Sequence, residues 1–132
     1  MFTVDASGYN QAAILNADGS PNSGENPAER GSIVAMYLTG EGLTNPLSAD
    51  GSIIGDTPPK PRLPVSVWFE DPRTGDGESA EVLYAGAVSG SVAGLMQLNI
   101  RVPAGARSGS LVPFYLQIGA GLAEVGFTLA VR

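Results

Sequence analysis

Apolar and polar residues alternate with a period of two along several stretches of this chain. Between Met96 and Val102 every second residue is apolar, and the same alternation recurs over residues 65–70 and 125–132. Successive side chains of a β-strand point to opposite faces, so this pattern gives one buried and one solvent-facing side. The alternation therefore predicts strands that pack into a sandwich or a barrel.

The remaining segments are assigned from the same pattern and from their turn residues. Short strands are expected over residues 2–4, 11–15, 80–84 and 110–118. Residues 32–40 are apolar on both sides, which favours a central strand but leaves a short buried helix open. The predicted core consists of Ile33, Met36, Val67, Phe69, Leu83, Leu98, Ile100, Phe114, Leu116, Phe127 and Leu129.

A proline-rich piece separates two of these strands. Four prolines fall within residues 58–64, and proline fixes φ and lacks the N–H that a central strand must donate. We expect this piece to run extended over the surface or along the edge of a sheet.

Composition supports an all-β domain. The chain has 132 residues with 18 Gly and 10 Pro, while 43% of residues are hydrophobic and 15% are charged. This combination favours short strands and tight turns over disorder. The length suits a single domain that spans residues 1–132.

Charge and residue types exclude several function classes. The net charge is −6 and no basic cluster occurs, which argues against a nucleic-acid partner. The chain has no Cys and no His, so thiolate chemistry and the commonest general base are absent and we expect no enzyme activity. No apolar run reaches the roughly 20 residues that span a bilayer. An export signal, if there is one, would have to precede Met1.

An acidic segment at residues 70–78 is a candidate metal site. Asp71, Asp76 and Glu78 follow Glu70 closely, and carboxylates on a glycine-containing loop are ligands that suit Ca²⁺. Their spacing does not match an EF-hand, however, and a solvated hairpin tip explains them better. We therefore expect no cofactor, with Ca²⁺ as the alternative.

Trp68 is the candidate for ligand binding. It lies on the face opposite to Val67 and Phe69, where an exposed indole could stack on a sugar or anchor a neighbouring domain. Tyr84 and Tyr115 are its possible partners in such a site. The favoured interpretation is that a loop covers the indole.

Two sets of segments resemble known domains. Residues 31–34, 38–43, 65–67, 80–86 and 102–105, with Gly109 beyond, resemble the immunoglobulin-like IPT/TIG domain. A closer resemblance is to the Solibacter-type C-terminal domain family of large secreted acidobacterial proteins. It is carried by residues 11–20, 39–46, 80–86, 94–103 and 130–132.

This resemblance implies an immunoglobulin-like antiparallel β-sandwich of about seven to nine strands. It also implies export and a position at the C-terminus of a longer polypeptide, but no activity. The chain departs from the family at residues 70–78, where a longer acidic hairpin replaces a short glycine-rich one.

The function expected on these grounds is that of a non-catalytic accessory module of a secreted or cell-surface bacterial protein. It would serve as a spacer, an attachment domain or a protein-interaction domain, with other domains of the parent protein or an extracellular component as partners. Two alternatives remain open. One is a carbohydrate-binding module that uses Trp68 and binds a polysaccharide, and the other is a C-terminal export or surface-attachment signal.

Overall fold

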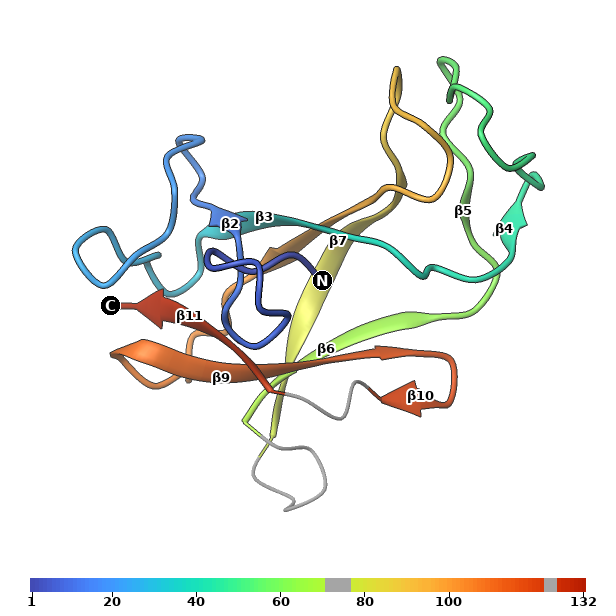
Figure 1. The fold of residues 1–132 in the computed structure, drawn as a ribbon. Coiled ribbons are helices and arrows are strands. Elements are labelled where there is room, and N and C mark those ends of the chain that lie inside the picture. The colour runs from blue at the N-terminus through green and yellow to red at the C-terminus, as the bar shows by residue number, and fades with distance from the viewer. Residues whose placement is uncertain (71–76, 123–125) are drawn as a thin grey trace.

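The computed structural model describes residues 1–70, 77–122 and 126–132, and within these ranges the chain forms strands and no helix (Figure 1). No helix there is long and apolar enough to cross a bilayer. The strands are β1 (Asn10–Gln11), β2 (Ile14–Leu15), β3 (Ile33–Leu38), β4 (Thr44–Asn45), β5 (Lys60–Pro61), β6 (Val65–Phe69), β7 (Glu78–Ala87), β8 (Met96–Arg101), β9 (Gly109–Ile118), β10 (Gly121–Leu122) and β11 (Phe127–Val131).

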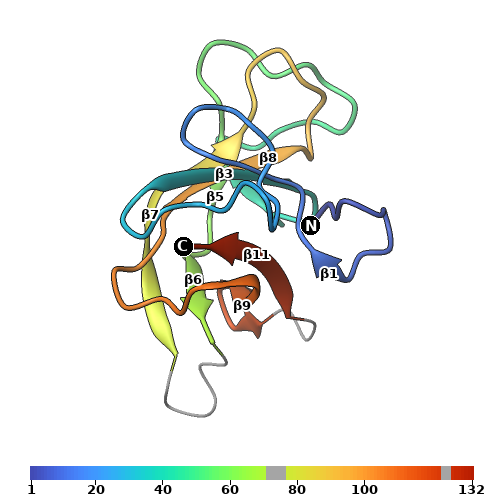
Figure 2. The ribbon, with the colours of Figure 1, turned by 90° about the vertical axis from the view of Figure 1, so that its left-hand side faces the viewer.

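The strands form two packed layers that share β7. One layer has the order β2-β3-β8-β7 and the other continues from β7 through β6, β9 and β11 to β1. Figure 2 shows the two layers one above the other. The first order corresponds to strands A, B, E and D of an immunoglobulin domain, and β6, β9 and β11 correspond to C, F and G. The fold is therefore an immunoglobulin-like β-sandwich, as expected, and the described strands pair antiparallel except β1 with β11.

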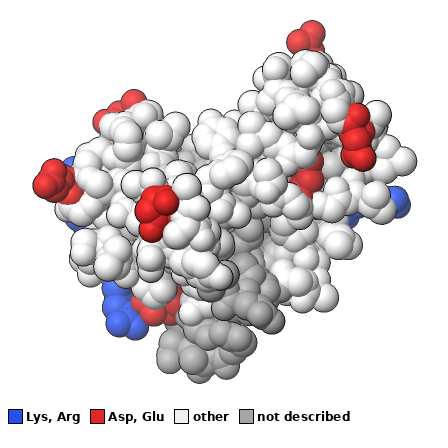
Figure 3. Space-filling view, in the orientation of Figure 1, with Lys and Arg blue, Asp and Glu red and all other residues white. Residues whose placement is uncertain are grey.

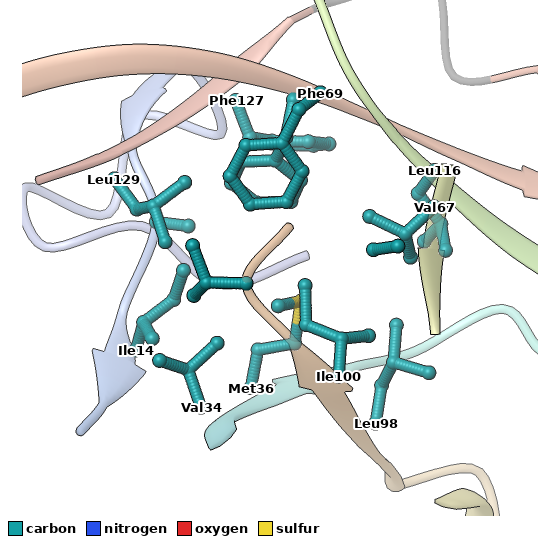
Figure 4. Close-up of a cluster of buried hydrophobic side chains, with 14 of the residues drawn as sticks. Ile14, Val34, Met36, Val67, Phe69, Leu98, Ile100, Leu116, Phe127 and Leu129 are labelled. Atoms are coloured by element: carbon teal, nitrogen blue, oxygen red, sulfur yellow. The ribbon is translucent and has the colours of Figure 1, made fainter. Parts of the chain in front are cut away.

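The predicted alternation produces the core between the layers (Figure 4). In β8 the side chains of Met96, Leu98 and Ile100 are completely buried, while the residues between them face outward. The aromatic centre is a row of three rings from β6, β9 and β11, with centroids 6.2 Å apart for Phe69 and Phe114 and 5.9 Å for Phe114 and Phe127. These spacings fall within the favourable range for aromatic pairs.

Two members of the predicted core are wrong. Ile33 is 39% exposed and Leu83 is 43% exposed. Residues 32–40 are apolar on both sides, so the pattern there does not define which face is buried, and the structure buries Val34 in place of Ile33. In β7 the register with β8 shifts between Val82 and Tyr84. Such a bulge adds one residue to the strand, and this extra residue, Leu83, faces outward.

Other boundaries also differ from the sequence-based expectation. Residues 2–4 do not form a strand, because Thr3 makes only a single bridge to Ala12. Residues 32–40 contain β3 and no helix, which confirms the favoured alternative. The proline-rich piece forms β5, and the Pro59 carbonyl accepts a hydrogen bond from the Ala87 N–H at the edge of β7. The predicted strand position Val125 lies outside the described residues.

The outer edge of β11 is closed by side-chain and main-chain bonds from residues 22–28. The Asn22 side chain donates to the Ala130 carbonyl at 2.9 Å and accepts from the Ala130 N–H at 2.8 Å. Further along, Ala28 bridges Val131 in parallel. Together with β1, these bonds occupy an edge that would otherwise offer free backbone groups to another strand.

Beyond the sandwich, residues 41–63 and 88–95 form a projecting region, here called the lobe (Figure 1). It contains the two-stranded sheet of β4 and β5. Ile53 in its first part bridges Val92 in its second. The lobe is thus formed by two separate segments of the chain that meet at one end of the sandwich.

Candidate functional site

The lobe exposes several large aliphatic side chains. Each is between 50% and 71% exposed, and they are Leu43, Leu47, Ile53, Leu63 and Val92. Figure 3 shows this part of the surface as mostly uncharged, with isolated acidic and basic groups. Single exposed aliphatic residues are ordinary. Here Ile53 and Val92 are bridge partners and Leu43 and Leu47 line the same hollow, so exposed aliphatic side chains lie near one another on the lobe, which is typical of a contact surface.

Main-chain hydrogen bonds hold the two parts of the lobe together. The Ile54 N–H donates to the Ser91 carbonyl at 2.9 Å, and the Ala93 N–H donates to the Ser52 carbonyl at 2.8 Å. The Ile54 side chain is buried and anchors this arrangement. Gly51 has a φ of 74°, a conformation that glycine adopts without strain and that reverses the chain before Ile53. The exposed side chains therefore stand on an ordered backbone.

Charged groups on the lobe are mixed in sign. Asp50 and Asp56 are exposed, and so are Lys60 and Arg62. Two acidic and two basic residues balance each other, so they produce no strong electrostatic potential of one sign. The lobe therefore suits recognition by apolar contact rather than by charge.

Glu41 is a buried acidic residue at the base of the lobe. It is 5% exposed, and its Oε2 atom is buried with no hydrogen-bond partner among the described residues. Burial raises the pKa of the Glu41 carboxyl, because the charged form loses its hydration. The sequence interpretation missed this residue, since an acidic residue between two glycines usually indicates an exposed turn.

Two hollows in the surface meet at Glu41. The first measures about 230 Å³ and lies on the lobe side, where Leu43 and Leu47 line it. The second measures about 460 Å³ and reaches toward the sandwich core, where Leu116 and Phe127 line it. Glu41 belongs to the wall of both, together with its neighbours Gly40 and Gly42.

The structure brings together two of the three predicted aromatic site residues. Trp68 of β6 and Tyr115 of β9 are direct cross-strand partners, and the Tyr115 hydroxyl lies 3.4 Å from where a Cβ on Gly126 would stand. Trp68 is partly buried, and its Nε1 atom is buried without a hydrogen-bond partner among the residues described.

Tyr84, the third aromatic residue, lies elsewhere. In β7 the partner of Trp68 is Ser79, and Tyr84 is five residues farther along the strand, roughly 17 Å at 3.3 Å per residue. Its hydroxyl donates to the Ala87 carbonyl at 2.7 Å. Burial, and then the charge of Glu41, raise the pKa of Tyr84.

The acidic hairpin is described only at its two ends. Asp71 and Asp76 lie outside the described residues. Glu70 forms an ion pair of 2.9 Å with Arg107, and Glu78 lies over the backbone of Gly105. Within the described ranges no three acidic side chains come together as a group that could hold a metal ion.

Sequence reasoning also missed the aliphatic surface of the lobe. Residues 41–57 contain many turn residues, which are typical of connecting loops. The available signal was the isolated Leu43, Leu47 and Ile53, which follow no strand alternation and stand among polar and glycine neighbours.

No protein-family model matches the chain, and neither a curated protein nor a solved structure is significantly similar to it. The functional assignment therefore depends on the geometry of the lobe, the Glu41 hollows and the Trp68 face.

Proposed function

We propose that this domain is a non-catalytic protein-interaction module and that the lobe is its contact surface. The observation that carries the proposal is the group of five exposed aliphatic side chains on the lobe: Leu43, Leu47, Ile53, Leu63 and Val92. The partner is a folded protein domain with a complementary apolar surface.

The order of the lobe backbone supports this function. A contact surface that is already held in place loses less conformational entropy on binding than a disordered loop. The bonds between residues 52–54 and 91–93 provide this preorganisation. The mixed charges around the aliphatic group would form the polar rim that is typical of protein interfaces.

The resemblance to Solibacter-type C-terminal domains supports the biological setting. We place the domain at the C-terminus of a longer bacterial protein that is secreted or displayed on the cell surface. The partner is then another domain of that protein or an extracellular protein. Export or surface-attachment signalling would be a special case of the same contact, in which the partner belongs to the export apparatus.

Polysaccharide binding is less well supported. Such a site needs aromatic faces that are open to solvent, whereas Trp68, Tyr84 and Tyr115 are each partly buried. Tyr84 is also remote from the other two along β7. These positions favour the lobe over the Trp68 face as the functional surface.

Photo-cross-linking in the full-length protein tests the proposal. A photoreactive amino acid is placed at Leu47 on the lobe or at Leu111 on β9, both of which are strongly exposed. We expect a cross-linked protein product from position 47, identified by mass spectrometry, and none from position 111.

A lobe variant supplies the control for this experiment. Leu43→Ser together with Ile53→Ser should abolish the product from position 47, because both changes remove apolar contact area without touching the core. Equal cross-linking from positions 47 and 111, or a product unaffected by the two substitutions, would refute the lobe as the contact surface.

A further inference from the structure

The buried Glu41 carboxyl belongs to the segment that leads from the end of β3 into the lobe. Glu41 is 5% exposed, and its Oε2 atom has no hydrogen-bond partner within the described part of the chain. A neutral carboxyl group tolerates such a place better than a carboxylate, because the charged form loses far more hydration. The packing of this segment against the sandwich therefore depends on whether Glu41 carries a proton.

Three other ionisable groups lie around Glu41. Tyr84 of β7 senses the charge of Glu41, Asp50 lines the smaller hollow with it, and the terminal residue Met1 lines the larger one. The residues of β9 and β11 that line the larger hollow are apolar. A phenol and an α-amino group ordinarily titrate well above a carboxyl group. Of these groups, Glu41 and Asp50 are therefore the ones that change charge in the acidic range.

The two hollows give an ionised carboxylate a route to water. Gly40, Glu41 and Gly42 line both of them, and their volumes are about 230 and 460 Å³. Gly40 and Gly42 have φ values of 88° and 73°, and a Cβ added at either position would meet no atom within 4 Å. Glycine moves between left-handed and right-handed conformations without the steric cost that other residues carry. The segment can therefore turn outward while the sandwich stays in place.

Movement of this segment reaches the contact surface of the lobe through the residues that follow. Leu43 is itself one of the exposed aliphatic side chains. Thr44 is buried, and its hydroxyl donates to the Pro46 carbonyl at 2.9 Å and accepts from the Ser48 N–H at 3.2 Å. These two bonds hold the turn that carries Leu47. A displacement of Thr44 thus disturbs two of the five aliphatic side chains.

We propose that ionisation of Glu41 releases residues 40–44 from the end of the sandwich, so that the lobe presents its contact surface at acidic pH and loses its order as the pH rises. The inference rests on the proposed function, because it assigns a regulation to the same surface. Its direction follows from burial: the protonated carboxyl is compatible with the packed segment, whereas the carboxylate recovers its hydration by leaving. Glutamine would fill the same space without this response.

Backbone order in the free protein is the first test. Amide order parameters are measured by ¹⁵N relaxation in steps from pH 4 to pH 8. For residues 40–44 we expect a decrease from about 0.85, the value of a rigid backbone, to below about 0.6. Glu41→Gln should keep the high value throughout, because its side chain has the same shape and no charge. Asp50→Asn is the matched control and should decrease like the unmodified protein.

The second test follows the contact itself. The cross-linked product from position 47 is quantified in the full-length protein over the same pH steps, with and without Glu41→Gln. The ratio of the yield with Glu41→Gln to the yield without it should increase with pH. This ratio isolates Glu41, because any titration of the partner affects both yields equally.

The regulation is refuted if the order parameters of residues 40–44 do not change with pH, if Glu41→Gln shows the same decrease, or if the ratio of yields is constant. The proposed function fails differently. A complete absence of product from position 47 at every pH refutes the lobe as the contact surface even when the order parameters change as expected, whereas a constant ratio with product present refutes only the regulation.

Discussion

At the scale of single residues, Glu41 departs from what stability alone would select. A carboxyl group at 5% exposure without a partner for Oε2 lowers the free energy of unfolding. Glutamine or an apolar residue of similar size would avoid the cost of burying a charge. Residues that cost stability in this way are concentrated at functional sites.

The cost of burying the charged Glu41 carboxylate predicts how the free energy of unfolding changes with pH. Its pKa is raised above the usual value of 4.5 in the folded protein, so between the unfolded and folded pKa values the folded state binds more protons than the unfolded state. The free energy of unfolding therefore decreases as pH rises through this interval. We expect Glu41→Gln to remove this decrease, measured by urea denaturation from pH 4 upward.

Glu25→Gln is the control for that series, because Glu25 is exposed. The decrease assigned to Glu41 should persist in this variant. If Glu41→Gln also leaves the pH dependence unchanged, the Glu41 carboxyl is not buried as described.

At the scale of elements, the alternation of residue types predicted the buried faces of β6, β8, β9 and β11. The alternation is clearest in β8, where Gln97, Asn99 and Arg101 alternate with the buried Met96, Leu98 and Ile100. Ile33 was misplaced because β3 has two apolar faces, and Leu83 because a bulge changes the phase within β7. Bulges depend on pairing with a neighbouring strand, which a single alternating pattern does not encode.

The candidate sites show the same limit. The face of Trp68 followed from alternation, but its pairing with Tyr115 depends on the register between β6 and β9. The paired residues of these two strands are more than 40 positions apart in the sequence. The local pattern of residue types does not specify which of them become partners. The burial of Glu41 likewise depends on how the lobe folds onto the end of the sandwich.

The closure of β11 by Asn22 gives a prediction for stability. Asn22→Ala leaves the buried Ala130 N–H without its acceptor and removes one donor to the Ala130 carbonyl. We expect a loss of about 2–3 kcal/mol in the free energy of unfolding. Asn26→Ala serves as the comparison, since Asn26 is exposed and water can replace its bonds, and it should cost less than about 1 kcal/mol. Equal losses would mean that Asn22 does not close the strand edge.

The position of Trp68 can be checked by fluorescence. Because the indole is partly buried with its Nε1 atom inaccessible, iodide should quench its emission much less than that of free tryptophan. Soluble polysaccharides should leave the spectrum unchanged. Strong quenching together with a polysaccharide-dependent shift would favour the carbohydrate-binding alternative over the lobe.

At the scale of the whole molecule, the sandwich and the lobe have different properties. The sandwich encloses a continuous core that includes a row of three mutually tilted phenylalanine rings, and no disulfide supports it because the chain has no Cys. The lobe instead directs aliphatic side chains to the solvent. This division assigns stability to the sandwich and recognition to the lobe.

Amide hydrogen exchange tests that division most directly. Exchange is measured by mass spectrometry on the isolated domain and on the full-length protein with its partners bound. We predict slower exchange in the bound form over residues 43–57 and 88–95, and unchanged exchange in β9 and β11, because the partner covers only the lobe. Identical exchange of the lobe in the two samples, or new protection confined to β6 and β9, would contradict the assignment of the lobe as the contact surface.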